Sequence, residues 1–271
     1  MRRPSIGVFD SGFGGLTVLK ALLELIPDAD YVYFGDTARL PYGSKSAETV
    51  AKYAVGASHY LEKHGAKMLV IACNTATALA FPEITRASAL PVVGVVEPGA
   101  DQAARASQNH RVVVIGTEAT VSSHAYHKAL EKRGVEAHEK ACPLLVPLVE
   151  EGWIDHSVTE QVARIYLAEA FAGGFEAADV LLLGCTHYPL LRPLLRRIAP
   201  EHITIVDSAE STAHVVKDLL QHSTPATRGQ ERRNLPRLKF FVTDSVEKFR
   251  RLGERFLGAP IENVLHVDLK E

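Results

Sequence analysis

Two stretches of the chain share one pattern: 69-LVIACNT-75 and 181-LLLGCTH-187. In each, an apolar run of the kind that forms a strand buried on both faces ends at a cysteine, which polar side chains follow. The two cysteines, Cys73 and Cys185, lie 112 positions apart. Strands buried on both faces belong to parallel sheets covered by helices, so the repeated pattern predicts two related α/β units.

Short β-branched runs alternate with helical periodicity on either side of these stretches, which is typical of βα units around a mostly parallel sheet. The first series predicts strands at 6–9, 31–35, 67–72 and 92–95 and helices at 15–26, 47–64 and 75–87. The second predicts strands at 112–116, 135–139, 179–183 and 203–206 and helices at 118–132, 157–172 and 190–198. Strands at 239–243 and 263–267, flanking a helix at 246–256, are expected to complete the first sheet.

The expected fold class is therefore α/β, with two similar domains that each contain a mostly parallel sheet flanked by helices. The first domain is discontinuous and comprises residues 1–97 and 207–271, whereas residues 98–206 form the second. Turn-forming residues gather at both predicted boundaries, at 97–99 and at 207–211. The polar segment 221–234, which contains Pro225 and Gly229, predicts an exposed loop.

Composition excludes several classes of protein. The 271 residues are 46% hydrophobic and have a formal net charge of −2, so nucleic acid is not the expected primary partner. The N-terminal residues lack the apolar core of a signal peptide, and no apolar stretch approaches the ~20 residues of a membrane span. We therefore expect a cytoplasmic protein with no membrane partner. Three cysteines in a chain of this length argue against a disulfide framework.

Cys73 and Cys185 are predicted at the carboxyl ends of strands, where α/β sheets collect ligands and helix N-termini offer free N–H groups. That position favours a thiolate, so a depressed thiol pKa and basic or nucleophilic behaviour are expected. The alternative is that each is a small apolar residue finishing a buried strand. A zinc site is disfavoured because neither has a second cysteine at CxxC spacing. For Cys142, packing is the favoured interpretation.

Two further strand ends carry unusual residues. The first runs through Asp10 and Ser11 into several glycines but lacks the GxGxxG and P-loop patterns, so a small anionic or zwitterionic ligand fits better than a nucleotide. Asp10 could cap the next helix, accept a hydrogen bond from a ligand ammonium group or influence a nearby thiol. The second, 34-FGDTARLPYGS-44, predicts either a structured turn or a set of N–H and hydroxyl groups facing the ligand.

Six blocks in order make the chain resemble bacterial glutamate racemases: 9-FDSGFGGLTVL-19, 33-YFGDTARLPYGSKS-46, 71-IACNTATA-78, 114-VIGTEATVSS-123, 142-CPLLVPLVEEG-152 and 181-LLLGCTHYPLL-191. The resemblance implies an amino acid racemase that needs neither cofactor nor metal and holds glutamate in a cleft between its two domains. It further implies a homodimer and a supply of D-glutamate for peptidoglycan synthesis.

The resemblance also assigns roles to residues. Cys73 would remove the α-proton of D-glutamate and Cys185 that of L-glutamate, with Asp10 and His187 assisting one thiol each. The substrate contacts that it implies are Asp10, Ser11, Pro41, Tyr42, Gly43, Ser44, Asn74, Thr75, Thr117, Thr120, Glu150 and Thr186. Three of these assignments have alternatives. Thr117 and Thr120 in the block 114–123 could simply cap a helix, and Glu150 in the block 142–152 could face solvent.

Three other functions compete with this interpretation. The nearest is another enzyme of the same architecture with paired cysteines, such as an aspartate or hydantoin racemase or a maleate isomerase. A thiol hydrolase or amidase would use one cysteine as nucleophile and His187 as its base. A binding protein would sense glutamate or another partner without turnover. Paired thiols at strand ends favour the racemase, since inverting a carbon centre needs an acid and a base on opposite faces.

Overall fold

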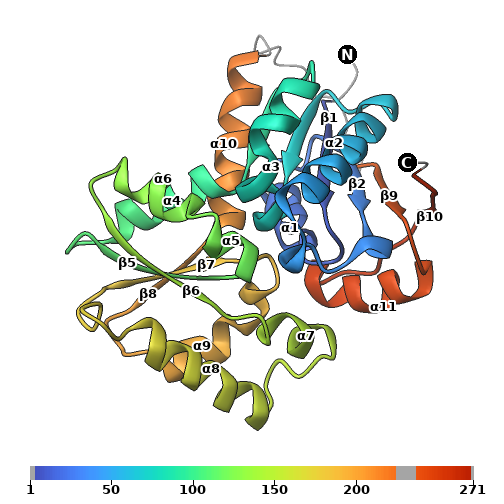
Figure 1. Ribbon diagram of the computed structural model, residues 1–271. Helices are drawn as coiled ribbons and strands as arrows, with labels where there is room; N and C mark the ends of the chain where they lie inside the picture. The colour runs from blue at the N-terminus through green and yellow to red at the C-terminus, as the bar shows by residue number, and fades with distance from the viewer. Residues whose placement is uncertain (1–3, 224–235, 270–271) are drawn as a thin grey trace.

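The computed structural model describes residues 4–223 and 236–269. Within these residues the strands form two sheets in which every neighbouring pair is parallel. The larger sheet has the order β10-β9-β2-β1-β3-β4 and the smaller β6-β5-β7-β8 (Figure 1). The strands of the larger sheet are β1 (Ser5–Asp10), β2 (Asp30–Gly35), β3 (Met68–Ile71), β4 (Val92–Gly94), β9 (Leu238–Val242) and β10 (Val264–His266). Those of the smaller are β5 (Arg111–Gly116), β6 (Glu136–Ala141), β7 (Val180–Gly184) and β8 (Thr204–Asp207).

Side chains that alternate along β1 bury both faces of the larger sheet. Ile6 and Val8 pack with helices α1 and α11, whereas Phe9 packs with α2 and α3 on the opposite face. The bounds of these helices are α1 (Leu16–Leu25), α2 (Ala47–Lys63), α3 (Asn74–Ala87) and α11 (Val246–Leu257). Helices on both faces explain why the strands are continuously apolar, as the sequence predicts.

The smaller sheet repeats this arrangement. Val112 and Val114 of β5 pack with α4 and α6, and Val113 and Ile115 pack with α8 and α9. The remaining helices are α4 (Val96–Ala106), α5 (Glu118–Ser122), α6 (Ala125–Glu131), α7 (Leu145–Glu150), α8 (Ser157–Ala170), α9 (Arg192–Ile198) and α10 (Ser208–Ser223). Single 3₁₀ turns are η1 (Thr37–Arg39), η2 (Tyr42–Ser44) and η3 (Tyr188–Leu191). The predicted fold class, with two parallel sheets flanked by helices, is confirmed.

Three local predictions differ from the structure. The single helix expected at 118–132 is two helices, α5 and α6, because His124 between them adopts a left-handed φ of 55° that a right-handed helix excludes. The short helix α7 is absent from the predicted elements. So is α4, which occupies the segment predicted as a boundary turn at 97–99.

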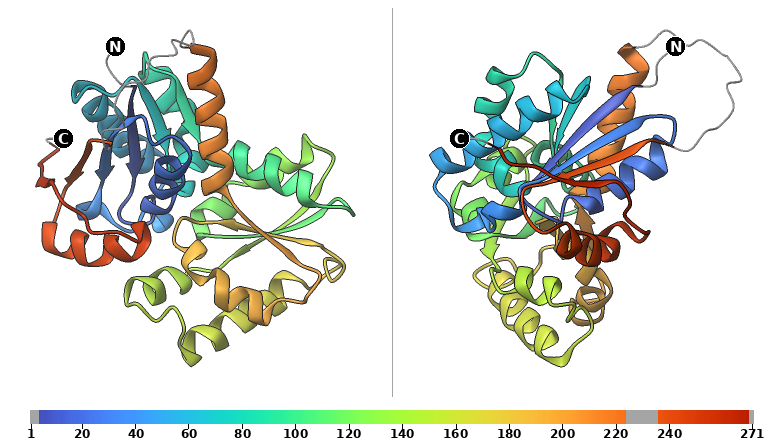
Figure 2. Two further views of the ribbon diagram at one scale, coloured as in Figure 1. Left: turned by 180° about the vertical axis from the view of Figure 1, so that it is seen from behind. Right: turned by 90° about the vertical axis from the view of Figure 1, so that its right-hand side faces the viewer.

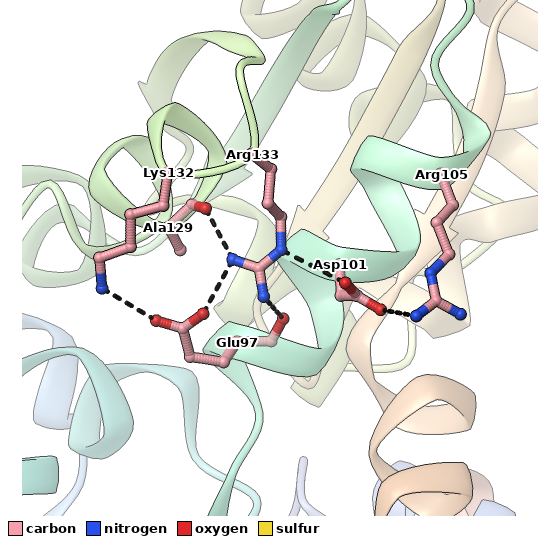
Figure 3. Close-up of polar contacts among 6 residues, drawn as sticks. All are labelled: Glu97, Asp101, Arg105, Ala129, Lys132 and Arg133. Atoms are coloured by element: carbon pink, nitrogen blue, oxygen red, sulfur yellow. Dashed lines mark hydrogen bonds and ion pairs between the residues drawn. The ribbon is translucent and has the colours of Figure 1, made fainter.

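Helix α4 forms in spite of Pro98 because proline is tolerated in a first turn, where its missing N–H would have no helical partner. Ion pairs then tie α4 to α6 (Figure 3). Glu97 accepts from Arg133 Nη1 at 2.9 Å and lies 3.5 Å from Lys132 Nζ, while Asp101 lies 3.4 Å from Arg133 Nε. Exposed pairs are individually weak, but here several charges form a network that links α4 to the residues directly after α6.

Helix α10 begins directly after β8 and packs against both α1 and α4, so it runs along the junction of the two sheets (Figures 1 and 2). Because α10 continues to Ser223, the first residues of the loop predicted at 221–234 are helical, and the remainder of that loop lies outside the described residues. The domain limits themselves stay a prediction. None of the described helices combines the length and apolar character needed to cross a bilayer.

Candidate active site

A cavity of about 560 Å³ lies where the carboxyl ends of strands from the two sheets face each other. Crevices outside the carboxyl ends of parallel strands are the usual ligand sites of α/β sheets. The lining residues are Ser11, Thr37, Leu40, Pro41, Tyr42, Gly43, Ser44, Cys73, Asn74, Thr75, Thr117, Glu118, Pro143, Val146, Pro147, Glu150, Cys185, Thr186, His187 and Lys248. Both predicted thiols therefore reach one cavity, one from each sheet.

Cys73 follows β3 and is the N-cap of α3. Its sulfur accepts a hydrogen bond from the Ala76 N–H at 3.4 Å, and its thiol donates to Ser11 Oγ at 3.5 Å. Burial and the nearby Asp10 carboxyl nevertheless raise the pKa of the Cys73 thiol to about 12. The predicted depression of this pKa is thus wrong, because the loss of hydration outweighs the helix N-terminus.

Cys185 follows β7, and its sulfur lies 4.0 Å from Nδ1 of His187. The other ring nitrogen, Nε2, lies 3.1 Å from Glu150 Oε1. Burial alone lowers the pKa of His187, but interactions with Cys185 and Glu150 outweigh it and raise that pKa to about 10. The raised pKa favours the protonated imidazole, held between the Cys185 sulfur and the Glu150 carboxylate. Glu150 takes part in the site instead of facing solvent.

Asp10 ends β1 and is fully buried. Its Oδ2 accepts from the Gly12 N–H at 2.8 Å, and burial raises the pKa of its carboxyl while the charge of His187 opposes that shift. Asp10 does not cap α1, whose N-cap is Gly15 without a side-chain hydrogen bond. Of the alternatives open from sequence, influence on a nearby thiol is the one that the geometry supports, since Asp10 acts on the pKa of Cys73.

The loop after β2 is held by a carboxylate to which the sequence analysis gives no role. Asp36 is fully buried and accepts from Tyr42 Oη at 2.6 Å, from Arg39 Nη1 at 2.9 Å and from Thr243 Oγ1 at 2.8 Å. A buried carboxylate with several donors locks the backbone that carries them. Asp36 thereby fixes Pro41 and the following residues at the edge of the cavity. The only sequence feature that pointed to Asp36 was its position within the block 33–46.

Threonines join the two sheets across the cavity. Thr75 Oγ1 lies 2.9 Å from Thr117 Oγ1, which lies 2.9 Å from Thr120 Oγ1. Thr117 also caps α5 by accepting from the Thr120 N–H. Thr120 is fully buried behind this pair and does not line the cavity. Capping and site formation are therefore joint roles of Thr117.

Glycine is required where the β1–α1 turn meets the other sheet. A Cβ atom built on Gly14 would lie 2.2 Å from Thr186 Oγ1 and 2.6 Å from His187 Nδ1. The approach is reinforced by Thr17 Oγ1, which donates to the Thr186 carbonyl at 3.2 Å. Gly14 of the block 9–19 thus serves close packing between the two sheets.

Within the described part of the chain, the buried side-chain atoms without a hydrogen-bond partner are Asp10 Oδ1, Thr37 Oγ1 and Asn74 Nδ2. All three belong to this region, because Thr37 and Asn74 line the cavity and Asp10 precedes Ser11, which also lines it. Unsatisfied buried polar atoms are rare in folded proteins and each calls for an explanation. A polar ligand in the cavity would supply partners for Thr37 and Asn74, which line it.

Comparisons with known proteins identify the family of the chain. A family model described as Asp/Glu/Hydantoin racemase matches residues 6–216. The chain belongs to this racemase family. A glutamate racemase of Koribacter versatilis is 58% identical over 286 residues, covering 99% of this chain and 98% of the relative.

Solved structures extend this family relationship to three dimensions. A glutamate racemase isoform of Bacillus anthracis has a TM-score of 0.91 at 36% identity and covers 99% of each chain. One from Francisella tularensis, solved in complex with D-glutamate, has a TM-score of 0.88 at 35% identity and covers 98% of each. The relatives over the full length are glutamate racemases and racemases are isomerases, so the chain is an isomerase of this family.

The racemase cavity contains every site residue predicted from sequence except Asp10 and Thr120, which lie outside its lining. Other lining residues have no role in the sequence analysis. Lys248 is the clearest case, because it is cationic and comes from α11, far along the chain from every quoted block. Pattern alone offered no signal for it, since an exposed lysine on an amphipathic helix is usually a solvated surface residue.

Proposed function

We propose that this racemase interconverts L-glutamate and D-glutamate through two thiols, without an organic cofactor or a metal. The observation that carries the proposal is the placement of Cys73 and Cys185 at the ends of β3 and β7, on one cavity. Inversion needs one group to take the α-proton and another to deliver a proton to the opposite face. Two thiols, one from each sheet, supply that pair from the chain itself.

In the direction from L-glutamate, the Cys185 thiolate removes the α-proton and becomes a thiol. The Cys73 thiol then delivers its proton to the opposite face of the carbanion and becomes a thiolate. The raised pKa of Cys73, about 12, supports this assignment, because it keeps Cys73 protonated until the carbanion forms. D-glutamate reacts by the reverse steps. Between turnovers the Cys185 thiol loses its proton to solvent and the Cys73 thiolate takes one up, which resets the pair; His187 beside Cys185 and Asp10 beside Cys73 assist these two transfers.

The carbanion needs charge stabilisation because an amino acid α-proton is only weakly acidic. Backbone N–H groups at Asn74, Thr75 and Thr186, all lining the cavity, are the donors that we assign to the substrate carboxylate. The protonated His187 and Lys248 add positive charge to the same cavity. A dicarboxylic amino acid suits such a lining.

The relatives support glutamate as the substrate, since full-length relatives carry that name and one was solved with D-glutamate. We extend the proposal to three properties that the resemblance implies: supply of D-glutamate for peptidoglycan synthesis, a cytoplasmic location and a homodimer.

The test is to incubate purified protein with L-glutamate in D₂O, without added cofactor, and to follow circular dichroism and α-deuterium together. Loss of optical activity with deuterium incorporation is the expected result. Activity on aspartate but not on glutamate would support the two-thiol mechanism and show that the substrate is aspartate. No change in optical activity or α-deuterium with any of these amino acids would refute racemisation and favour a thiol hydrolase or a binding protein.

A further inference from the structure

Tyr126 joins the two sheets at a point that the mechanism above does not use. It lies on α6 of the smaller sheet, is fully buried, and its hydroxyl donates to Asn74 Oδ1 at 2.6 Å. Asn74 is the first residue of α3, follows Cys73 directly and lines the cavity. A short buried hydrogen bond from the opposite sheet therefore ends one residue from a catalytic thiol.

The direction of this hydrogen bond is fixed by its surroundings. Burial raises the pKa of Tyr126, so its hydroxyl keeps its proton, while a side-chain hydrogen bond from Ser208 acts in the opposite sense. Ser208 is the first residue of α10 and is also buried. The protonated hydroxyl of Tyr126 is thus the donor in its hydrogen bond with Asn74 Oδ1. An amide that receives a proton from Tyr126 must present its oxygen to it.

This hydrogen bond also determines where the amide nitrogen of Asn74 lies. Because Oδ1 of Asn74 faces Tyr126, the amide nitrogen Nδ2 is directed elsewhere, and it is one of the buried atoms that lack a partner. A side-chain amide free to rotate could exchange its oxygen and nitrogen, which would turn a donor into an acceptor. Tyr126 prevents this exchange. The unpartnered nitrogen remains a hydrogen-bond donor beside a cavity proposed to hold carboxylates.

We propose that Tyr126 is a positioning residue, which holds the Asn74 amide so that Nδ2 donates to a carboxylate of the bound amino acid. This inference rests on the proposed function. It adds a residue from the smaller sheet that acts on substrate only through Asn74. Since the bond spans the two sheets, it also makes the orientation of Asn74 depend on their relative placement.

The test compares Tyr126→Phe with the wild type. Phenylalanine removes only the hydroxyl and keeps the ring, which packs so close to Gly184 that a Cβ atom added there would lie 3.0 Å from it. We expect the KM for L-glutamate to rise about tenfold with kcat changed by less than about threefold, since the lost interaction binds ground state and transition state alike. In an Asn74→Ala background the same substitution should change kcat/KM by less than about twofold, because the group it positions is gone.

Tyr31→Phe is the matched control. Its hydroxyl is also buried and donates to the Leu22 and Ile26 carbonyls, away from the cavity, so its removal should leave KM unchanged. An unchanged KM in Tyr126→Phe, or an equal loss of kcat/KM with and without the Asn74 side chain, would overturn the positioning role. A wild type that neither binds nor racemises glutamate would instead refute the proposed function, and this inference with it.

Discussion

Nε2 of His187 lies 3.1 Å from Oε1 of Glu150, on the opposite edge of the imidazole from the nitrogen that faces Cys185. The ring is therefore held between a carboxylate from α7 and a thiol that follows β7. The interactions with Cys185 and Glu150 outweigh burial and raise the pKa of this histidine to about 10. It also links the acid–base state of one thiol to a residue on a different helix.

Glu150→Gln should lower the pKa of His187. The free energy of unfolding of the variant should then depend less steeply on pH. The pKa of His187 is raised from 6.5 to about 10 on folding, so its protonation stabilises the fold fully below about pH 6.5 and is lost as pH rises through 10. Urea unfolding at several pH values across this window should show a shallower decline for the variant than for the wild type. Glu151→Gln removes an equal charge from the neighbouring exposed residue and should keep the wild-type slope. Identical slopes in all three proteins would contradict the ion pair.

Cys73→Ala and Cys185→Ala should each reduce racemisation by about 10²- to 10⁴-fold, because each removes one of the two proton-transfer groups. Circular dichroism spectra should stay those of the folded protein. Cys142→Ala is the control: this thiol is buried but does not line the cavity, so activity should persist. Full activity in either of the first two variants would end the two-thiol mechanism.

Asp10→Asn and His187→Asn should slow the two reaction directions unequally. Asp10 acts on Cys73 and His187 on Cys185, so each variant impairs the resetting of a different thiol. The measurement is kcat and the solvent isotope effect on kcat in each direction, starting from pure L- or D-glutamate, because the equilibrium constant of one between enantiomers makes kcat/KM the same in both directions. Equal changes in both directions would argue against separate assistants.

Gly14→Ala should lower activity by more than about tenfold, because the added Cβ would lie 2.2 Å from Thr186 Oγ1 and would displace a side chain that lines the cavity. Gly56→Ala is the matched control, since a Cβ there meets nothing within 4 Å and the residue lies within α2. That control should stabilise the protein by about 0.5–1 kcal/mol. Normal activity in Gly14→Ala would mean that the contact between the sheets is loose.

Lys248→Gln should raise the KM for glutamate about fivefold, with a smaller effect at high salt. Lys248 lines the cavity, its Nζ lies 5.8 Å from the centroid of the Phe13 ring, and it forms no ion pair within the described part of the chain. Arg250→Gln changes the net charge equally on the same helix, but residue 250 does not line the cavity. If both variants raise KM alike, the effect belongs to overall charge and not to this position.

Much of the fold could be predicted because its causes are local. Apolar runs such as 69-LVIA-72 must be buried on both faces, and parallel strands with crossover helices satisfy that requirement in few ways. Helices α4 and α7 escaped prediction because packing, and for α4 the ion pairs of Arg133, stabilise segments that contain a proline, and in α4 also a glycine, which favour turns.

For the site, the sequence by itself determined which residues stand at the strand ends, including both thiols, whereas the tertiary structure brought the two strand ends to one cavity. Only the tertiary structure decided what surrounds them. Burial beside Asp10, and not the helix N-terminus, sets the pKa of Cys73, and hydration depends on every element packed around a group. The contacts of Tyr126 with Asn74 and of Gly14 with Thr186 likewise join residues more than 50 positions apart. Such pairs carry no signature in either local sequence, because their geometry exists only once two sheets have packed together.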